Sequence, residues 1–433
     1  MTTNSISVSA PQHRVETVTV TVTGREGPAL PGLDVSVEQL THAFGFGNIG
    51  FDFLQTIGGP DPEGADLVDG FGGGTPFDHD GLADAWLRLF NLAVLPFYWG
   101  RYEPRQSQPD RSRVLTTANW LGRHDVTVKG HPLVWHTSQP SWLLGRGLAE
   151  VEALLRAHIR EVVSDFAGTI DLWDAINESV IMPAFANGDN AITPLAAARG
   201  RLQMIRLAFE EARNANPSAR LVINDFDLSP KYEHAIEEAL DSGVGIDAIG
   251  LQTHMHQGYR GEDAILSVVD RFARFGIPLQ MTETTLVSGH LMPTSVRDLN
   301  DYRIPNWPST PEGEERQARE VESHYRSLFA HPAIESITYW GFTDAGSWLG
   351  APVGFMRADG SMKPSYYTLE KLIHDEWWVP KTAIRTDEHG NLRLSACAGS
   401  YLVSSSVGSA TFTIQPGSHV VNARIEAPRE RGA

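Results

Sequence analysis

Eight short apolar segments, each followed by a stretch with helical spacing, constrain the fold of this chain more than any other feature. Near-continuous apolar strands are typical of a parallel sheet buried on both faces. Eight strand and helix repeats over roughly 330 residues predict a closed (β/α)8 barrel, or TIM barrel. An open, doubly wound sheet is the alternative. We expect the strands at residues 42–49, 92–99, 126–135, 170–177, 219–225, 246–254, 278–284 and 334–342.

The two ends of the chain have a different pattern. Residues 15–37 alternate polar and apolar types around a Gly/Pro-rich turn, and the residues after Trp378 contain similar runs broken by Gly, Asn and Ser. Such runs predict strands, and each end is too small to bury a core alone. We therefore expect an N-terminal β segment at 1–40, a barrel at 41–375 and a C-terminal β segment at 376–433. The two end segments should pair into one small β-sandwich-like accessory domain.

Charge and composition exclude several classes of partner. The chain has 53 Asp and Glu against 35 Lys and Arg, a net charge of −18, which repels nucleic acids and anionic membrane surfaces. No apolar run of about 18 residues is present to span a bilayer. Residues 1–14 lack the basic and apolar regions of a secretory signal. We therefore expect a cytoplasmic protein, or a secreted one whose signal has already been removed.

Catalytic groups of such a barrel lie where the strands end, at the carboxyl face. The expected fourth strand ends with Asn177 and Glu178, and the seventh ends with Glu283. Two carboxyl groups at one barrel mouth suit glycoside hydrolysis, because one protonates the leaving oxygen while the other attacks the anomeric carbon or activates water. An ion pair is the alternative for a lone Glu, but neither segment offers a basic partner. Asp225 and Asp227, after the fifth strand, are expected to form turns or helix caps.

Other strand ends add further polar and aromatic candidates: His136, Gln252, His254, Trp340 and Trp348. For His254 and its neighbour His256, three interpretations stay open: a hydrogen bond that orients a carboxylate, a metal site, and a core histidine. No HExxH or comparable ligand spacing is present, and we expect neither a metal nor another cofactor. Trp340 and Trp348 lie where an indole can face a sugar ring, whereas most of the other nine Trp are expected in the core.

In their order along the chain, these segments resemble glycoside hydrolase family 10, the retaining endo-1,4-β-xylanases with a (β/α)8 barrel. The resemblance covers about residues 40–373, and 283 − 178 = 105 residues separate the two glutamates. The order of the motifs along the chain makes this resemblance highly specific. The segments that carry it are GHPLVWHTSQPSWL, WDAINES, INDFDL, IDAIGLQTHM, MTET, YWGFTDAGSW and KPSYYTL.

The resemblance implies roles for individual residues. Glu178 would be the general acid/base and Glu283 the nucleophile of a double displacement. Asn177 would bind the 2-hydroxyl of the sugar, and His254 would hold Glu283. The implied substrate-binding residues are His136, Asn177, Gln252, His254, Trp340 and Trp348.

One segment departs from the family pattern. The family has TPENEMKW on its second strand, with polar groups that grip xylose hydroxyls, whereas residues 92–98 read LAVLPFY here. An endo-xylanase-like hydrolase and a β-glycosidase acting on a non-xylan β-glycoside or short oligosaccharide therefore both stay open. A non-catalytic carbohydrate-binding barrel is a third hypothesis, against which the retained glutamates argue. The sugar, endo or exo action, the oligomeric state and the role of the terminal segments stay open.

Overall fold

The computed structural model describes residues 5–25, 27–60 and 81–426. These residues form two compact units. The larger unit takes in residues 46–324 and 333–366, and the smaller one contains both chain ends with residues 325–332. Each unit has its own sheet structure and its own hydrophobic core.

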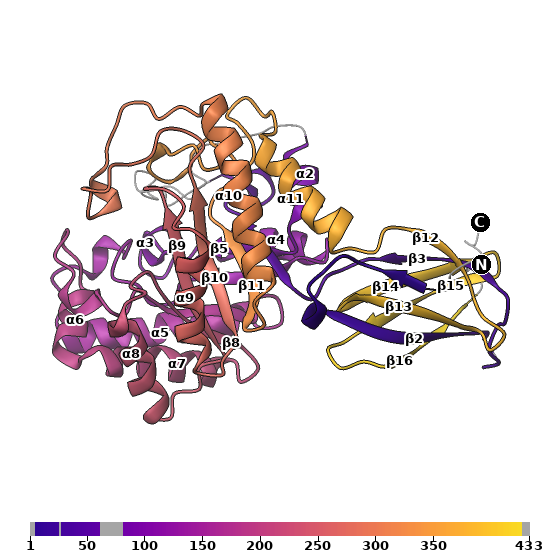
Figure 1. The fold of residues 1–433 in the computed structure, drawn as a ribbon. Coiled ribbons are helices and arrows are strands. Elements are labelled where there is room, and N and C mark those ends of the chain that lie inside the picture. The colour runs from indigo at the N-terminus through magenta and orange to yellow at the C-terminus, as the bar shows by residue number, and fades with distance from the viewer. Residues whose placement is uncertain (1–4, 26, 61–80, 427–433) are drawn as a thin grey trace. The chain divides into compact units, whose positions relative to one another are not determined.

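Within the described ranges, the larger unit contains a closed barrel of eight parallel strands (Figure 1). Its strands follow one another around the barrel in chain order, and the last strand, β11, closes it onto the first, β4. All eight apolar segments of the sequence supply one strand each, so the predicted (β/α)8 barrel is confirmed and the open sheet is wrong. The strands are β4 (Gly45–Ile49), β5 (Leu92–Pro96), β6 (Thr127–His131), β7 (Leu172–Asn177), β8 (Arg220–Asp225), β9 (Ala248–Met255), β10 (Leu279–Leu286) and β11 (Ile334–Tyr339).

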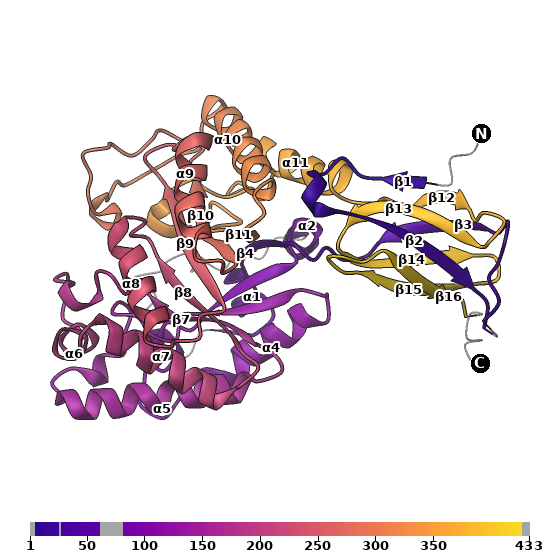
Figure 2. The same ribbon diagram turned by 60° about the horizontal axis from the view of Figure 1, so that its bottom comes forward.

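The helices lie outside the barrel strands (Figure 2). In α5 the buried residues Val151, Leu155, Ile159 and Val162 follow the 3.6-residue period, so one apolar stripe faces the sheet. None of the helices in the described ranges has the length and apolar character needed to cross a membrane. The helices are α1 (Asp52–Thr56), α2 (Leu82–Leu89), α3 (Trp99–Tyr102), α4 (Arg111–Gly122), α5 (Leu148–Phe166), α6 (Ile192–Arg199), α7 (Arg201–Ala215), α8 (Pro230–Asp241), α9 (Glu262–Ala273), α10 (Pro311–Phe329) and α11 (Pro364–Lys371).

The smaller unit is a β-sandwich to which both ends of the chain contribute. Among its described residues, β1 (Ser5–Ser7), β13 (Asn391–Cys397), β2 (Val15–Thr23) and β16 (Val420–Arg424) form one four-stranded sheet. The other contains β12 (Thr382–Arg385), β3 (Asp34–Gln39), β14 (Gly399–Ser405) and β15 (Gly408–Ile414). Both sheets send apolar side chains into one core, for example Val20 from β2 and Tyr401 from β14. The accessory domain predicted from paired terminal strands is confirmed.

Candidate active site

Two irregular strands carry the glutamates that the sequence singles out. Glu178 directly follows β7, whose register with β8 shifts between Asp174 and Ile176. Glu283 lies in β10, whose register with β9 shifts between Met281 and Glu283. Such bulges re-aim side chains next to functional sites. The first shift ends two residues before Glu178, and the second ends at Glu283 itself.

A buried amide network joins the two strands. Nδ2 of Asn224, on β8, donates to Oε1 of Glu283 and to Oδ1 of Asn177, with both distances 2.8 Å. Nε2 of Gln252 donates to the same Asn177 oxygen at 3.0 Å. His254 Nε2 lies 3.0 Å from the other oxygen of Glu283. Both oxygens of Glu283 are therefore held by side-chain nitrogen atoms, one from β8 and one from β9.

Asn224 is itself fixed from two sides. The Thr282 hydroxyl donates to its Oδ1 at 2.6 Å. This hydrogen bond fixes the orientation of the amide, so that its nitrogen faces Glu283. Gly250 on β9 lies on the other side, where an added Cβ would come within 2.5 Å of Asn224 Oδ1. Only glycine leaves room for this amide.

Glu178 has a strained backbone and a perturbed carboxyl group. Its φ is 57°, in the left-handed region that non-glycine residues seldom adopt, and its N–H donates to the Asn224 carbonyl at 2.8 Å. Trp135 Nε1 donates to Glu178 Oε2 at 2.8 Å. Burial, with a further contribution from the negative charges of Glu283 and Asp225, raises the pKa of Glu178 to about 8 against the hydrogen bond from Trp135. The carboxyl group therefore keeps its proton at neutral pH.

Asp225 holds the turn that carries Glu178. Its Oδ2 accepts from the Val180 N–H at 3.0 Å and from the Ser179 hydroxyl at 3.4 Å, while its Oδ1 accepts from the Asp227 N–H at 3.0 Å. Asp225 is therefore a turn former, as the sequence predicts. Burial raises the pKa of Asp225 to about 7.

His131, at the end of β6, belongs to the site although the sequence analysis passed over it. Its Nδ1 lies 2.7 Å from Asp174 Oδ2, and the other Asp174 oxygen lies 2.6 Å from Lys129 Nζ. Burial alone would raise the pKa of Asp174, but Lys129 and His131 outweigh it and the pKa is lowered. The ionised carboxylate accepts a hydrogen bond from Nδ1–H, so the other ring nitrogen of His131, Nε2, faces Glu283 Oε1 at 3.9 Å. The sequence did contain a signal for this group: Lys129, His131 and Asp174 are polar residues inside two otherwise apolar strands.

His136 lies beside Glu178. Its Nε2 is 3.7 Å from Glu178 Oε2, and its ring centroid is 4.2 Å from that of Phe185. Neither ring nitrogen has a hydrogen-bond partner among the residues that the structure describes. Burial lowers the pKa of His136 to about 3, so the ring is neutral.

Two indoles and a second histidine surround His254. The ring centroid of Trp348 is 4.7 Å from that of His254, and the Trp340 ring is 6.3 Å from His254 and 5.2 Å from His131. His256 is buried, with Nδ1 3.3 Å from Thr285 Oγ1. The structure thus brings together all eight predicted site residues. Of the three interpretations for His254, it shows the hydrogen bond to a carboxylate, and no group of three potential metal ligands occurs in the described ranges.

The segment that follows β5 adds aromatic rings to this mouth. The buried ring of Tyr98 lies 5.8 Å from His131, 5.5 Å from Trp135 and 6.1 Å from Phe51. Burial raises the pKa of Tyr98, and the negative charge of Glu283 raises it further. Tyr98 was not predicted as a site residue, because an aromatic residue after an apolar strand is usually part of the core.

The sequence profile described as glycosyl hydrolase family 10 matches residues 97–372, more than half of the chain. The chain belongs to glycosyl hydrolase family 10. This confirms the resemblance read from the motifs and makes the protein a glycoside hydrolase. The match begins only after β5, so the first two barrel strands of this family 10 enzyme lie outside it.

Individual relatives of this family 10 enzyme are xylanases. It is 26% identical over 332 residues to endo-1,4-beta-xylanase B of Thermotoga neapolitana, covering 71% of this chain and 88% of the relative. It is 30% identical over 261 residues to a beta-1,4-xylanase of Dictyoglomus thermophilum, covering 58% and 70%. The structure of native xylanase 10B from Thermotoga maritima aligns with a TM-score of 0.57 at 24% identity, covering 77% of this chain and 95% of that one. This last likeness concerns the fold alone.

Proposed function

We propose that this enzyme hydrolyses β-1,4-linked xylan-type chains with retention of configuration, using Glu178 as general acid/base and Glu283 as nucleophile. The observation that carries the proposal is the contrast between the two carboxyl groups. Burial keeps Glu178 protonated near neutral pH, whereas Glu283 accepts hydrogen bonds on both oxygens from Asn224 and His254. A retaining glycosidase needs one carboxyl group that gives a proton and another that attacks as a carboxylate.

The reaction then proceeds in two displacements. In the first, a Glu283 oxygen forms a bond to the anomeric carbon while the bond to the leaving oxygen breaks, and Glu178 gives its proton to that oxygen. In the second, Glu178 removes a proton from water, which attacks the anomeric carbon and releases Glu283. Each displacement inverts the anomeric carbon, so the product has the configuration of the substrate.

Neighbouring side chains have donors and acceptors suited to a sugar. Asn177 Oδ1 already accepts from Asn224 and Gln252, which leaves its amide nitrogen to donate to a sugar hydroxyl. His131 Nε2 can accept from another hydroxyl, because the ring carries its hydrogen on Nδ1, which donates a hydrogen bond to Asp174. Trp340 and Trp348 supply apolar walls for the ring faces of the sugar.

A second candidate is a β-glycosidase that acts on a non-xylan glycoside or short oligosaccharide. The observation that favours it is the aromatic segment after β5, where Tyr98 packs against Phe51 and Trp135. A site rejects a poorly matching sugar most strongly when that sugar leaves polar groups of the protein unpaired. A barrel mouth with fewer polar groups therefore selects less strongly for one particular sugar. Comparing kcat/KM for polymeric xylan, xylo-oligosaccharides and a panel of aryl β-glycosides separates the two candidates. Turnover of the polymer supports the first, and turnover of short glycosides alone supports the second.

Replacing the nucleophile tests what both candidates share. In Glu283→Ala we expect kcat/KM for aryl β-glycosides to fall by at least roughly 10⁴-fold, because no covalent intermediate can form. In the unchanged enzyme, a 2-fluoro glycoside with a good leaving group should label the peptide that contains Glu283, as detected by mass spectrometry. Undiminished turnover by Glu283→Ala would overturn the assignment.

A further inference from the structure

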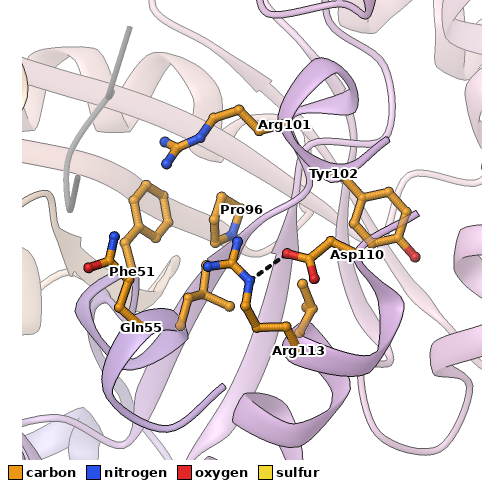
Figure 3. A pocket seen from close by; sticks show the side chains of 9 residues that line it. Phe51, Gln55, Pro96, Arg101, Tyr102, Asp110 and Arg113 are labelled. Atoms are coloured by element: carbon orange, nitrogen blue, oxygen red, sulfur yellow. Dashed lines mark hydrogen bonds and ion pairs between the residues drawn. The ribbon is translucent and has the colours of Figure 1, made fainter. Parts of the chain in front are cut away.

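A narrow hollow lies beside the barrel mouth, between the segments that follow β4 and β5 (Figure 3). Its cavity volume is about 20 Å³. A space of this size accommodates one water-sized group and no pyranose ring. The side chains that form it include Phe51, Gln55, Pro96, Arg101, Asp110 and Arg113.

The two arginines of this hollow differ in their pairing. Nε of Arg113 lies 2.5 Å from Asp110 Oδ2, and both side chains are 11% exposed. Arg101 is only partly exposed, and in the described part of the chain its guanidinium has no hydrogen bond or ion pair. Figure 3 shows the Arg101 side chain apart from the Arg113 and Asp110 pair. A partly desolvated cation without a counterion gains free energy from an anionic ligand.

An aromatic ring connects this hollow with the aromatic residues of the proposed active site. The Phe51 ring, which lines the hollow, lies 6.1 Å from Tyr98 and 5.7 Å from Trp340. Burial and the negative charge of Glu283 raise the pKa of Tyr98, while the positive charge of Arg101 lowers it. Arg101 and the catalytic carboxyl groups are thus both close enough to act electrostatically on one side chain.

We propose that Arg101 binds the carboxylate of a uronic acid that the substrate carries next to the cleaved linkage. This rests on the proposed glycoside hydrolysis and specifies its substrate class. The hollow admits one oxygen of the carboxylate, while the sugar ring stays outside it, against the aromatic residues. A planar guanidinium matches a carboxylate in shape and charge, and a neutral sugar would leave it unpaired.

The test compares two oligosaccharides of equal length, one with a uronic acid branch and one in which that carboxyl group is the neutral amide. For the unchanged enzyme we expect kcat/KM to favour the acidic substrate by roughly tenfold, as for one hydrogen bond between charged groups. In Arg101→Gln the ratio of the two kcat/KM values should fall toward one, and Arg101→Lys should retain part of it. Arg123→Gln is the matched control, because exposed Arg123 ends α4 just before β6, at the opposite end of that strand from the site.

Each outcome bears on one proposal. No preference in the unchanged enzyme, or a preference that survives in Arg101→Gln, overturns the assignment of Arg101. A stronger preference for a phosphorylated or sulfated branch overturns the assignment of a uronic acid. Failure of the unchanged enzyme to cleave either oligosaccharide, or any aryl glycoside, overturns the proposed function instead.

Discussion

Glu178 and Glu283 are both carboxyl groups in one barrel mouth, and their immediate partners make them chemically different. The indole of Trp135 is the partner of Glu178, whereas the amide of Asn224 and the imidazole of His254 hold Glu283. Burial favours the neutral form of a carboxyl group, and hydrogen-bond donors favour the charged form. At the scale of single residues, this difference of environment divides the proposed roles.

The raised pKa of Glu178 predicts an alkaline limit to activity. Below about pH 8 the acid is protonated and can assist the leaving group, and as the pH rises through about 8 it loses that proton. We expect kcat/KM for a glycoside with a poor leaving group to fall about tenfold per pH unit above this value. A dinitrophenyl glycoside, whose leaving group needs no proton, is the control. An equal alkaline decline for both substrates would contradict the role of Glu178.

The negative charge of Asp225 predicts that its removal shifts the alkaline limit of activity. Its negative charge raises the pKa of Glu178, so Asp225→Asn should move the alkaline limb of the pH profile downward, by up to about one pH unit. Asp227→Asn makes the same charge change two residues further along the turn and should shift the limb less. If the two variants have the same profile, Asp225 does not act through Glu178.

At the scale of elements, the barrel strands determine where each group points. Gly250 on β9 matters because it lies where β9 passes the Asn224 side chain of β8. The bulges in the pairings of β7 and β10 act in the same way, by changing the direction of one side chain without breaking the sheet. The strands therefore control the chemistry through backbone spacing as well as through side chains.

Adding one methyl group at Gly250 should disturb the active site indirectly, through Asn224. In Gly250→Ala the new Cβ would lie 2.5 Å from Asn224 Oδ1 and 2.8 Å from Thr282 Cγ2. We expect the free energy of unfolding to fall by about 1–3 kcal/mol and kcat/KM to fall as Asn224 moves away from Glu283. Gly245→Ala is the control, since an added Cβ there meets no heavy atom within 4 Å. Unchanged kinetics in Gly250→Ala would show that Asn224 does not position Glu283.

At the scale of the whole molecule, the chain divides its residues between two units with separate tasks. All eight predicted site residues belong to the larger unit. The smaller unit joins strands from both chain ends in each of its sheets, so the chain enters the barrel from this sandwich and returns to it. Stability of the sandwich and chemistry in the barrel should therefore respond to different mutations.

A mutation that creates a cavity in the sandwich core should lower stability without changing activity. Leu394 on β13 is fully buried in that core. We expect Leu394→Ala to lower the free energy of unfolding by about 2–5 kcal/mol, measured by chemical denaturation, while kcat/KM at 25 °C stays unchanged. A loss of kcat/KM in the folded variant would show that the two units are coupled.

The sequence by itself determined the barrel, the sandwich and the two glutamates. Apolar runs that alternate with helical stretches can be recognised from short stretches of sequence. The motifs at the ends of strands four and seven are also short, so the two glutamates can be recognised from their neighbours in the chain. The family resemblance already implied the contact of His254 with Glu283, whereas the tertiary structure alone decided which further side chains contact the two glutamates. His131, Asn224, Trp135 and Tyr98 come from three other strand ends and look like core residues in sequence. Their contacts depend on strand register, and register arises only when the barrel closes.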